Sequence, residues 1–163
     1  MQFLQKYFPH LLLSVYIVES IVLGVAPYSR SVWYAENIPI VLVILFLVVL
    51  YIRGIRFSNL GYFLMSILPF LHTIGGHYTF ELVPFDWFNN FFGLERNMFD
   101  RVGHFSVGLY AFPIIEYLNM KNLVNKKSVA ISYAIFAIAF VAVFYEWIEW
   151  YYAATEGGSA GAA

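Results

Sequence analysis

Two pairs of ionisable side chains, each spaced to lie on one face of a helix, are the residues of this chain that could perform catalysis. Asp100 and His104 are four residues apart, and Glu146 and Glu149 are three apart, so each pair shares one face of a helix. The chain has no cysteine, which excludes thiolate chemistry and leaves catalysis to His, Asp and Glu. We therefore take Asp100, His104, Glu146 and Glu149 as the candidate catalytic residues.

A metal site is one chemistry that these residue types allow. His72, His77 and His104, with carboxylates nearby, are candidate ligands for a divalent metal such as zinc, iron or manganese. Such a metal would activate a water molecule for hydrolysis or group transfer. However, His72 and His77 lack the i, i+4 spacing of a helical zinc motif, and Gly75-Gly76 between them predicts a break in the helix.

A second chemistry needs no metal. Here His104, held by Asp100, acts as a general acid or base, and Arg101 receives a phosphate or carboxylate. Arg101 and Glu81 are the candidate ligand-binding residues. A purely structural alternative is that Asp100 caps its helix while the His and Glu side chains form hydrogen bonds across a helix bundle.

The elements that must position these residues are membrane-spanning helices. The composition is 61% hydrophobic and 12% charged, whereas a soluble domain averages roughly 45–50% apolar and about 25% charged residues. Five apolar stretches are about long enough to cross a bilayer, at residues 8–26, 38–52, 59–75, 100–118 and 129–152. The sequence therefore predicts a single all-α membrane domain, a polytopic transmembrane helical bundle of about five helices embedded in the lipid bilayer.

The connecting segments carry the basic residues that predict orientation. A short polar loop is expected from Tyr28 to Asn37, and an aromatic segment at 78–99 is expected to lie along the membrane surface. With the N-terminus cytoplasmic, six basic residues face inward and three outward: Lys6, Arg53, Arg56, Lys121, Lys126 and Lys127 against Arg30, Arg96 and Arg101. This topology places the candidate catalytic and metal-binding residues at the outer face of the membrane.

The net charge and the distribution of polar residues argue for or against other functional classes. A net charge of −1 argues against nucleic-acid binding. A transporter could use Glu19, His104 and Glu149 as a proton or ion relay, but the inner halves of the spans offer few polar residues to complete it. A non-enzymatic scaffold could use segment 78–99 as its docking surface. We interpret Glu116 and His10 as interfacial.

Three sequence motifs carry a family resemblance. The chain resembles the YjdF-type family of bacterial inner-membrane proteins, which is distantly similar to the VanZ-like family, in the motifs at residues 72–78, 100–105 and 145–150. The resemblance implies a multi-pass protein of the bacterial cytoplasmic membrane with a link to the cell envelope, and it names no reaction. Family members continue into a further acidic segment, so we expect the natural chain to extend past Ala163.

The hypothesis that follows is a membrane protein with a polar His/Asp/Glu pocket at the outer leaflet. The pocket would bind or process a lipid or an envelope precursor, because lipid head groups lie at that depth. The transporter component and the membrane scaffold remain the alternatives.

Overall fold

The computed structural model describes residues 2–155, apart from the side chains of residues 2–6, 149, 152, 153 and 155. The described residues form helices and contain no strand, which confirms the all-α prediction. The helices are α1 (Gln2–Leu23), α2 (Arg30–Ile52), α3 (Asn59–Tyr78), α4 (Asp86–Phe92), α5 (Phe99–Val107), the 3-10 turn η1 (Gly108–Tyr110), α6 (Ala111–Met120) and α7 (Lys127–Thr155). The sequence end at residues 156–163, where we expected the natural chain to continue, lies outside the described residues.

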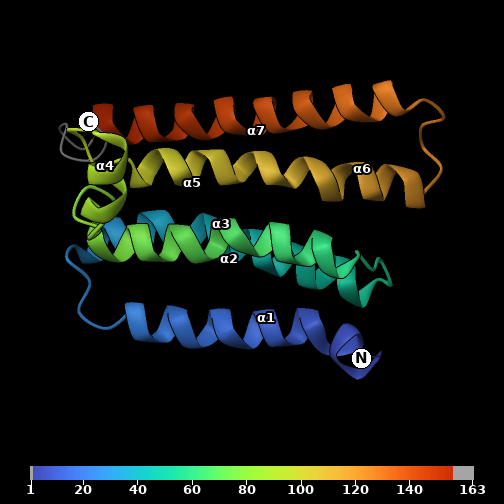
Figure 1. Ribbon diagram of the computed structural model, residues 1–163, viewed down its shortest axis with the longest axis horizontal. Helices are drawn as coiled ribbons and strands as arrows, with labels where there is room; N and C mark the ends of the chain where they lie inside the picture. The colour runs from blue at the N-terminus through green and yellow to red at the C-terminus, as the bar shows by residue number, and fades with distance from the viewer. Residues whose placement is uncertain (1, 156–163) are drawn as a thin grey trace. The chain divides into compact units, whose positions relative to one another are not determined.

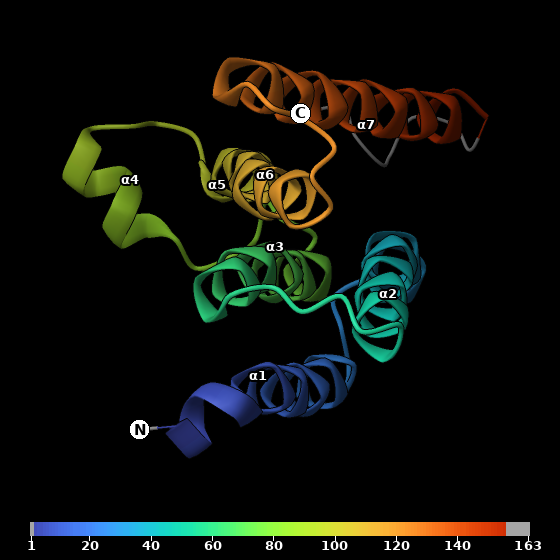
Figure 2. The same ribbon diagram turned by 90° about the vertical axis from the view of Figure 1, so that its right-hand side faces the viewer.

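The chain divides into two compact units, Met1–Leu109 and Tyr110–Ala163. In the first unit, α3 is the shared partner of α1, α2 and α5 (Figures 1 and 2). The hydroxyl of Thr73, a fully buried residue of α3, donates to the Tyr16 hydroxyl of α1 at 3.5 Å. The central position of α3 is what allows it to bring residues of α2 and α5 together.

Helix α2 begins earlier than the sequence predicts. The side chain of Ser29 caps the helix by accepting a hydrogen bond from the Val32 amide at 3.4 Å. The predicted loop from Tyr28 to Asn37 is therefore wrong from Arg30 onward, because the cap allows the helix to start among polar residues. The additional turns carry Glu36, which lies shortly before the predicted span.

Helix α3 also continues through the expected break. Gly75 and Gly76 are both buried inside the helix, which ends only at Thr79, a residue in the left-handed conformation with φ 59°. A side chain on Gly75 would collide with the ring of Phe80, and one on Gly76 would lie 2.6 Å from the Asn37 amide nitrogen. The two glycines therefore serve close packing rather than helix termination.

The predicted fourth span, at 100–118, consists of α5, η1 and α6 in direct succession rather than of one α-helix. Pro113 cannot donate a backbone hydrogen bond to the carbonyl four residues earlier, and its ring crowds that carbonyl. The backbone tightens into a 3-10 turn at Gly108–Tyr110, one turn before the proline. The interruption is thus a local consequence of the proline.

The predicted interfacial segment 78–99 is folded on itself around α4. The rings of Phe85 and Phe88 stack with centroids 4.7 Å apart, and Phe85 also meets the edge of Phe99 at 5.3 Å. The amide of Asn97 donates to the carbonyls of Glu81 at 3.0 Å and Val83 at 2.8 Å. These contacts close the segment into a compact loop ahead of α5.

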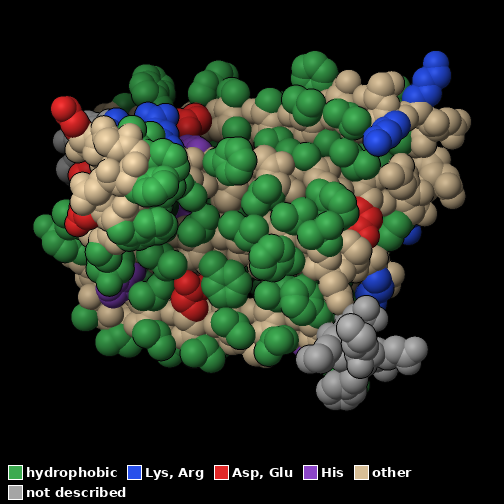
Figure 3. All heavy atoms as spheres, viewed as in Figure 1, with side chains coloured by type: hydrophobic (Ala, Val, Ile, Leu, Met, Phe, Trp, Pro, Cys, Tyr) green, Lys and Arg blue, Asp and Glu red, His purple; other side chains and the backbone are tan. Residues whose placement is uncertain are grey.

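The exposed surfaces of the long helices are apolar. Two described helical segments are long and apolar enough to cross a membrane, Arg30–Ile52 and Lys127–Ile148, and Tyr7–Leu23 is a shorter apolar helix. Large hydrophobic side chains are exposed along α1, α2 and α7, and Figure 3 shows many hydrophobic side chains on one face. Such surfaces need a lipid environment, in agreement with the predicted membrane helical bundle.

The second unit is a helical pair formed by α6 and α7. The two helices are connected by the short segment that contains Lys121 and Lys126. Ala130 and Ala134, one turn apart on α7, are completely buried at 1% and 0% exposure. Small residues at this spacing allow close helix contact in a membrane protein.

Candidate functional site

Four ionisable side chains from three helices of the first unit form the candidate site. Glu36 lies in the second turn of α2, His72 lies in the second half of α3, and Asp100 and His104 lie on α5. We call these four residues the polar cluster. His72 interacts electrostatically with both Asp100 and His104, and it contacts Glu36 directly. The cluster therefore connects α2, α3 and α5.

The contact between Glu36 and His72 is the more buried part of the cluster. Oε2 of Glu36 lies 3.5 Å from Nδ1 of His72, and the two side chains are 20% and 14% exposed. Gly76 makes this approach possible, because a side chain there would lie only 3.2 Å from Cβ of Glu36. Glu36 is not among the residues predicted from the sequence, although a Ser29 cap would have extended the predicted helix to include it.

The contact between Asp100 and His104 is the more exposed part. Nε2 of His104 lies 3.2 Å from Oδ1 of Asp100, one helical turn away, so the contact predicted from the spacing is present. The side chains of His104 and Asp100 are 45% and 40% exposed. The pair is therefore partly exposed at the surface of the first unit.

Asp100 does not cap α5, so the capping part of the structural alternative is wrong. The cap position is Met98, which makes no side-chain cap hydrogen bond, and Asp100 lies inside the first turn of the helix. The Asn97 side chain instead accepts the Phe99 amide hydrogen at 2.9 Å. Asp100 therefore has no capping role, and its carboxylate contacts His104.

Phe80 is a second residue that sequence analysis missed. Its ring meets the edge of the His72 ring with centroids 5.1 Å apart and lies 6.3 Å from the ring of Phe99. Gly75 on α3 leaves room for this ring, and a Cβ added to Gly103 on α5 would lie 3.9 Å from it, at ordinary contact distance. Phe80 itself has φ 57°, a left-handed backbone conformation unusual for an aromatic residue. The ring therefore acts as an apolar wall beside His72.

His77 takes part in a different contact. Its Nδ1 lies 2.7 Å from the carbonyl oxygen of Leu23, and its own carbonyl accepts the Tyr28 amide hydrogen at 2.9 Å. His77 therefore joins the end of α3 to the connection between α1 and α2. The side chains described here contain no group of three or more His, Asp or Glu residues that could hold a metal ion. The metal site at His72, His77 and His104 stays a prediction.

The remaining candidate residues lie apart from these contacts or in the second unit. Arg101 is exposed next to Asp100, and Glu81 is exposed in the loop before α4, so both stay candidate ligand-binding residues. Glu146 is an exposed residue of α7, and Glu149 lies on the same helix with its side chain outside the described residues. The convergence of the two glutamates on His104 stays a prediction.

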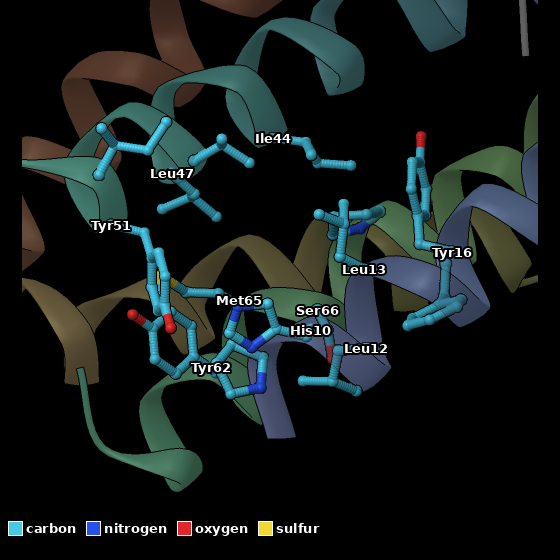
Figure 4. A pocket seen from close by; sticks show the side chains of 15 residues that line it. His10, Leu12, Leu13, Tyr16, Ile44, Leu47, Tyr51, Tyr62, Met65 and Ser66 are labelled. Carbon is cyan, nitrogen blue, oxygen red and sulfur yellow. The ribbon is translucent and has the colours of Figure 1, made fainter. Parts of the chain in front are cut away.

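A separate cavity of about 340 Å³ lies between α1, α2 and α3 (Figure 4). It is lined largely by apolar side chains from residues 9–16 of α1, 44–52 of α2 and 62–70 of α3. None of the four residues of the polar cluster lines it. His10, which we interpreted as interfacial, does line it and meets the edge of the Tyr51 ring at 5.2 Å.

Comparison with known proteins identifies related sequences. A family model described as "Predicted membrane protein (DUF2238)" matches residues 8–163. The inner membrane protein YjdF of Escherichia coli (strain K12) is 28% identical over 140 residues, which cover 84% of this chain and 66% of that protein. The chain thus spans just under two thirds of this curated relative. No solved structure matches the chain.

Proposed function

Because the chain belongs to the DUF2238 family of predicted membrane proteins, we propose that it is a multi-pass protein of the bacterial inner membrane that binds a lipid or envelope precursor at the polar cluster. The Escherichia coli relative is named an inner membrane protein, which supports the proposed location in the inner membrane. We further propose that His104 processes the bound molecule by acid–base chemistry. The predicted topology, with a cytoplasmic N-terminus, places the cluster at the outer leaflet.

The observation that carries the proposal is the pair of carboxylate–histidine contacts held side by side by three helices. Ionisable groups near a bilayer are costly, so they usually pair, face a bundle interior or line a polar pathway. The Glu36–His72 contact is mostly buried, whereas the Asp100–His104 contact is open on one side. A mostly buried pair near a partly exposed pair suits a binding site, since only the exposed pair needs to meet the ligand.

The Asp100–His104 contact supports an acid–base role for His104. With Nε2 directed at the carboxylate, the neutral imidazole carries its hydrogen there, which leaves the lone pair on Nδ1 as the proton acceptor. The carboxylate also stabilises the imidazolium that forms when His104 takes up a proton. Arg101, exposed on the same helix, supplies a cation for a phosphate of the bound precursor.

Complementation of a deletion strain tests this function. We expect His104→Ala and Asp100→Asn to fail to restore resistance to envelope-active antibiotics, while Glu95→Gln, an exposed loop substitution, restores it fully. Immunoblots of the membrane fraction ensure that the variants are compared at equal protein levels. Full complementation by both cluster variants at normal levels would reject the proposed function.

Lipid analysis of the purified protein separates binding from processing. We expect a lipid or precursor to be enriched with the wild-type protein and depleted with Glu36→Gln, which disturbs the contact to His72. His104→Gln should retain the bound molecule but stop its conversion. An identical lipid profile for all three proteins would count against a binding site at the polar cluster.

A further inference from the structure

The cavity between α1, α2 and α3 is lined by none of the residues of the polar cluster, although its lining on α3 reaches Phe70, two residues before His72. Its lining comes from residues 9–16 of α1, 44–52 of α2 and 62–70 of α3. Most of the lining is aliphatic or aromatic, as in Leu13, Ile44 and Leu47 (Figure 4). Its apolar length suits a hydrocarbon ligand and excludes a purely polar one.

One end of the cavity is lined by polar rings and lies beside a cation. The His10 ring meets the edge of Tyr51, and the Tyr51 and Tyr62 rings lie 6.3 Å apart. Figure 4 shows Tyr51, Tyr62 and His10 close together, with Tyr16 apart from them. The guanidinium carbon of Arg56 lies 3.3 Å from the centroid of the Tyr51 ring, so a permanent positive charge adjoins the lining. Arg53, the C-cap residue of α2, directly follows the lining residue Ile52 in the sequence.

We propose that this cavity binds an anionic phospholipid, with one acyl chain between α1 and α2 and the phosphate group beside Arg56. The apolar walls match the acyl chain, and the cation beside one end matches the charge of the head group. Basic residues next to the bilayer attract anionic lipids. The charge also distinguishes this ligand from an apolar helix of another protein or of a second copy of this chain, neither of which needs a cation at one end.

Photolabelling and native mass spectrometry of the detergent-purified full-length chain test the proposal. The probe is phosphatidylglycerol with a photoactivatable group in one acyl chain, and the comparison lipid is phosphatidylcholine with the same chains. We expect the label on peptides of α1, α2 and α3 that line the cavity. We also expect phosphatidylglycerol to be retained preferentially, and Arg56→Gln to weaken its binding about fivefold.

Matched substitutions show whether the cavity itself holds the chain. Ile44→Trp fills the cavity and should abolish the labelling of its lining, whereas Leu42→Trp places the same ring on an exposed position of α2 outside the lining. Leu47→Phe is a smaller filler for use if Ile44→Trp does not fold. Lys126→Gln removes an exposed charge of the second unit and should leave lipid binding unchanged.

Several outcomes would overturn the proposal. Equal retention of the two lipids, or unchanged binding in Arg56→Gln, would show that no anionic head group is recognised. Labelling that is scattered over exposed helix faces, or that survives both fillers, would show that the acyl chain lies elsewhere. Crosslinks from the cavity to another polypeptide, with no retained phospholipid, would assign the cavity to a protein partner. These results are independent of the polar cluster and of its proposed function.

Discussion

At the scale of single residues, the two histidines of the polar cluster occupy different environments. His72 is enclosed by Glu36 and the ring of Phe80, whereas His104 is nearly half exposed and contacts Asp100. The spacing of Asp100 and His104 was sufficient to predict their contact because both lie on one helix. The contact between Glu36 and His72 joins two helices, so no spacing in the sequence could reveal it.

The predicted metal site is testable at this same scale. The metal site predicted at His72, His77 and His104 requires about one equivalent of zinc, iron or manganese in the purified protein and its loss from a His72→Ala/His104→Ala variant. Elemental analysis by mass spectrometry measures this, on protein purified without a metal-binding affinity tag. His10→Ala serves as the control, since His10 lines the separate apolar cavity and should not affect the metal content.

The result decides between the two chemistries. Absence of metal from both wild type and variant would contradict the metal prediction and leave the metal-free interpretations, a lipid-binding pocket with acid–base chemistry at His104 or a structural polar bundle. If the double variant loses the metal and His10→Ala retains it, the result would support metal-dependent hydrolysis at the membrane surface.

At the scale of elements, α3 organises the first unit through its glycines. Gly75 leaves space for the Phe80 ring, and Gly76 leaves space for Asn37 of α2. Each glycine therefore allows a neighbouring segment to pack closely against α3. In a membrane, where helix association depends on close packing, small residues at such contacts are especially valuable. Their role in the polar cluster is indirect, since Phe80 contacts His72 and Gly76 allows Glu36 to approach.

Substitution at Gly75 should therefore cost stability. We expect Gly75→Ala to lower the free energy of unfolding by about 1–3 kcal/mol, because the new methyl group displaces the Phe80 ring. Thermal unfolding in detergent, followed by circular dichroism, measures the change. Gly108→Ala is the matched control, because nothing lies near its added carbon, and it should be neutral. Equal stability of the two variants would contradict the packing role of Gly75.

The N-terminal cap of α3 allows a second test, which measures how much the cap stabilises this helix. Ser58 accepts a hydrogen bond from the Gly61 amide at 3.1 Å, so Ser58→Ala should destabilise the protein by about 1 kcal/mol. Ser58→Asp retains a capping oxygen and should recover most of that loss. The same unfolding measurement compares the three proteins, and failure of Ser58→Asp to recover stability would indicate that the cap is not the cause.

At the scale of the whole molecule, exposed apolar helices define a membrane protein, and the family match agrees. The orientation in the membrane is still a prediction from the distribution of basic residues. It matters for function, because it decides whether the polar cluster faces the periplasm or the cytoplasm.

The absence of cysteine makes the orientation easy to measure. We expect a cysteine at Asn90, an exposed residue of α4, to react with a membrane-impermeant maleimide in intact spheroplasts. A cysteine at Lys126, between α6 and α7, should react only after lysis. The opposite pattern would invert the topology and place the polar cluster on the cytoplasmic side. The cysteine-free protein controls for background labelling.

The sequence by itself determined the helical class and the membrane environment, because apolar length and composition act through the solvent and do not depend on packing. It also predicted the Asp100–His104 contact, which needs only the geometry of one helix. Tertiary structure decided the other features of the site. These are the position of Glu36, the packing of the Phe80 ring, the separation of His77 from His72, and the apolar cavity beside Arg56. The separation of His77 from His72 follows from α3 continuing as one helix through Gly75 and Gly76. The other features depend on how closely neighbouring helices approach, and that distance is set by small residues and caps whose effect appears only after the helices pack.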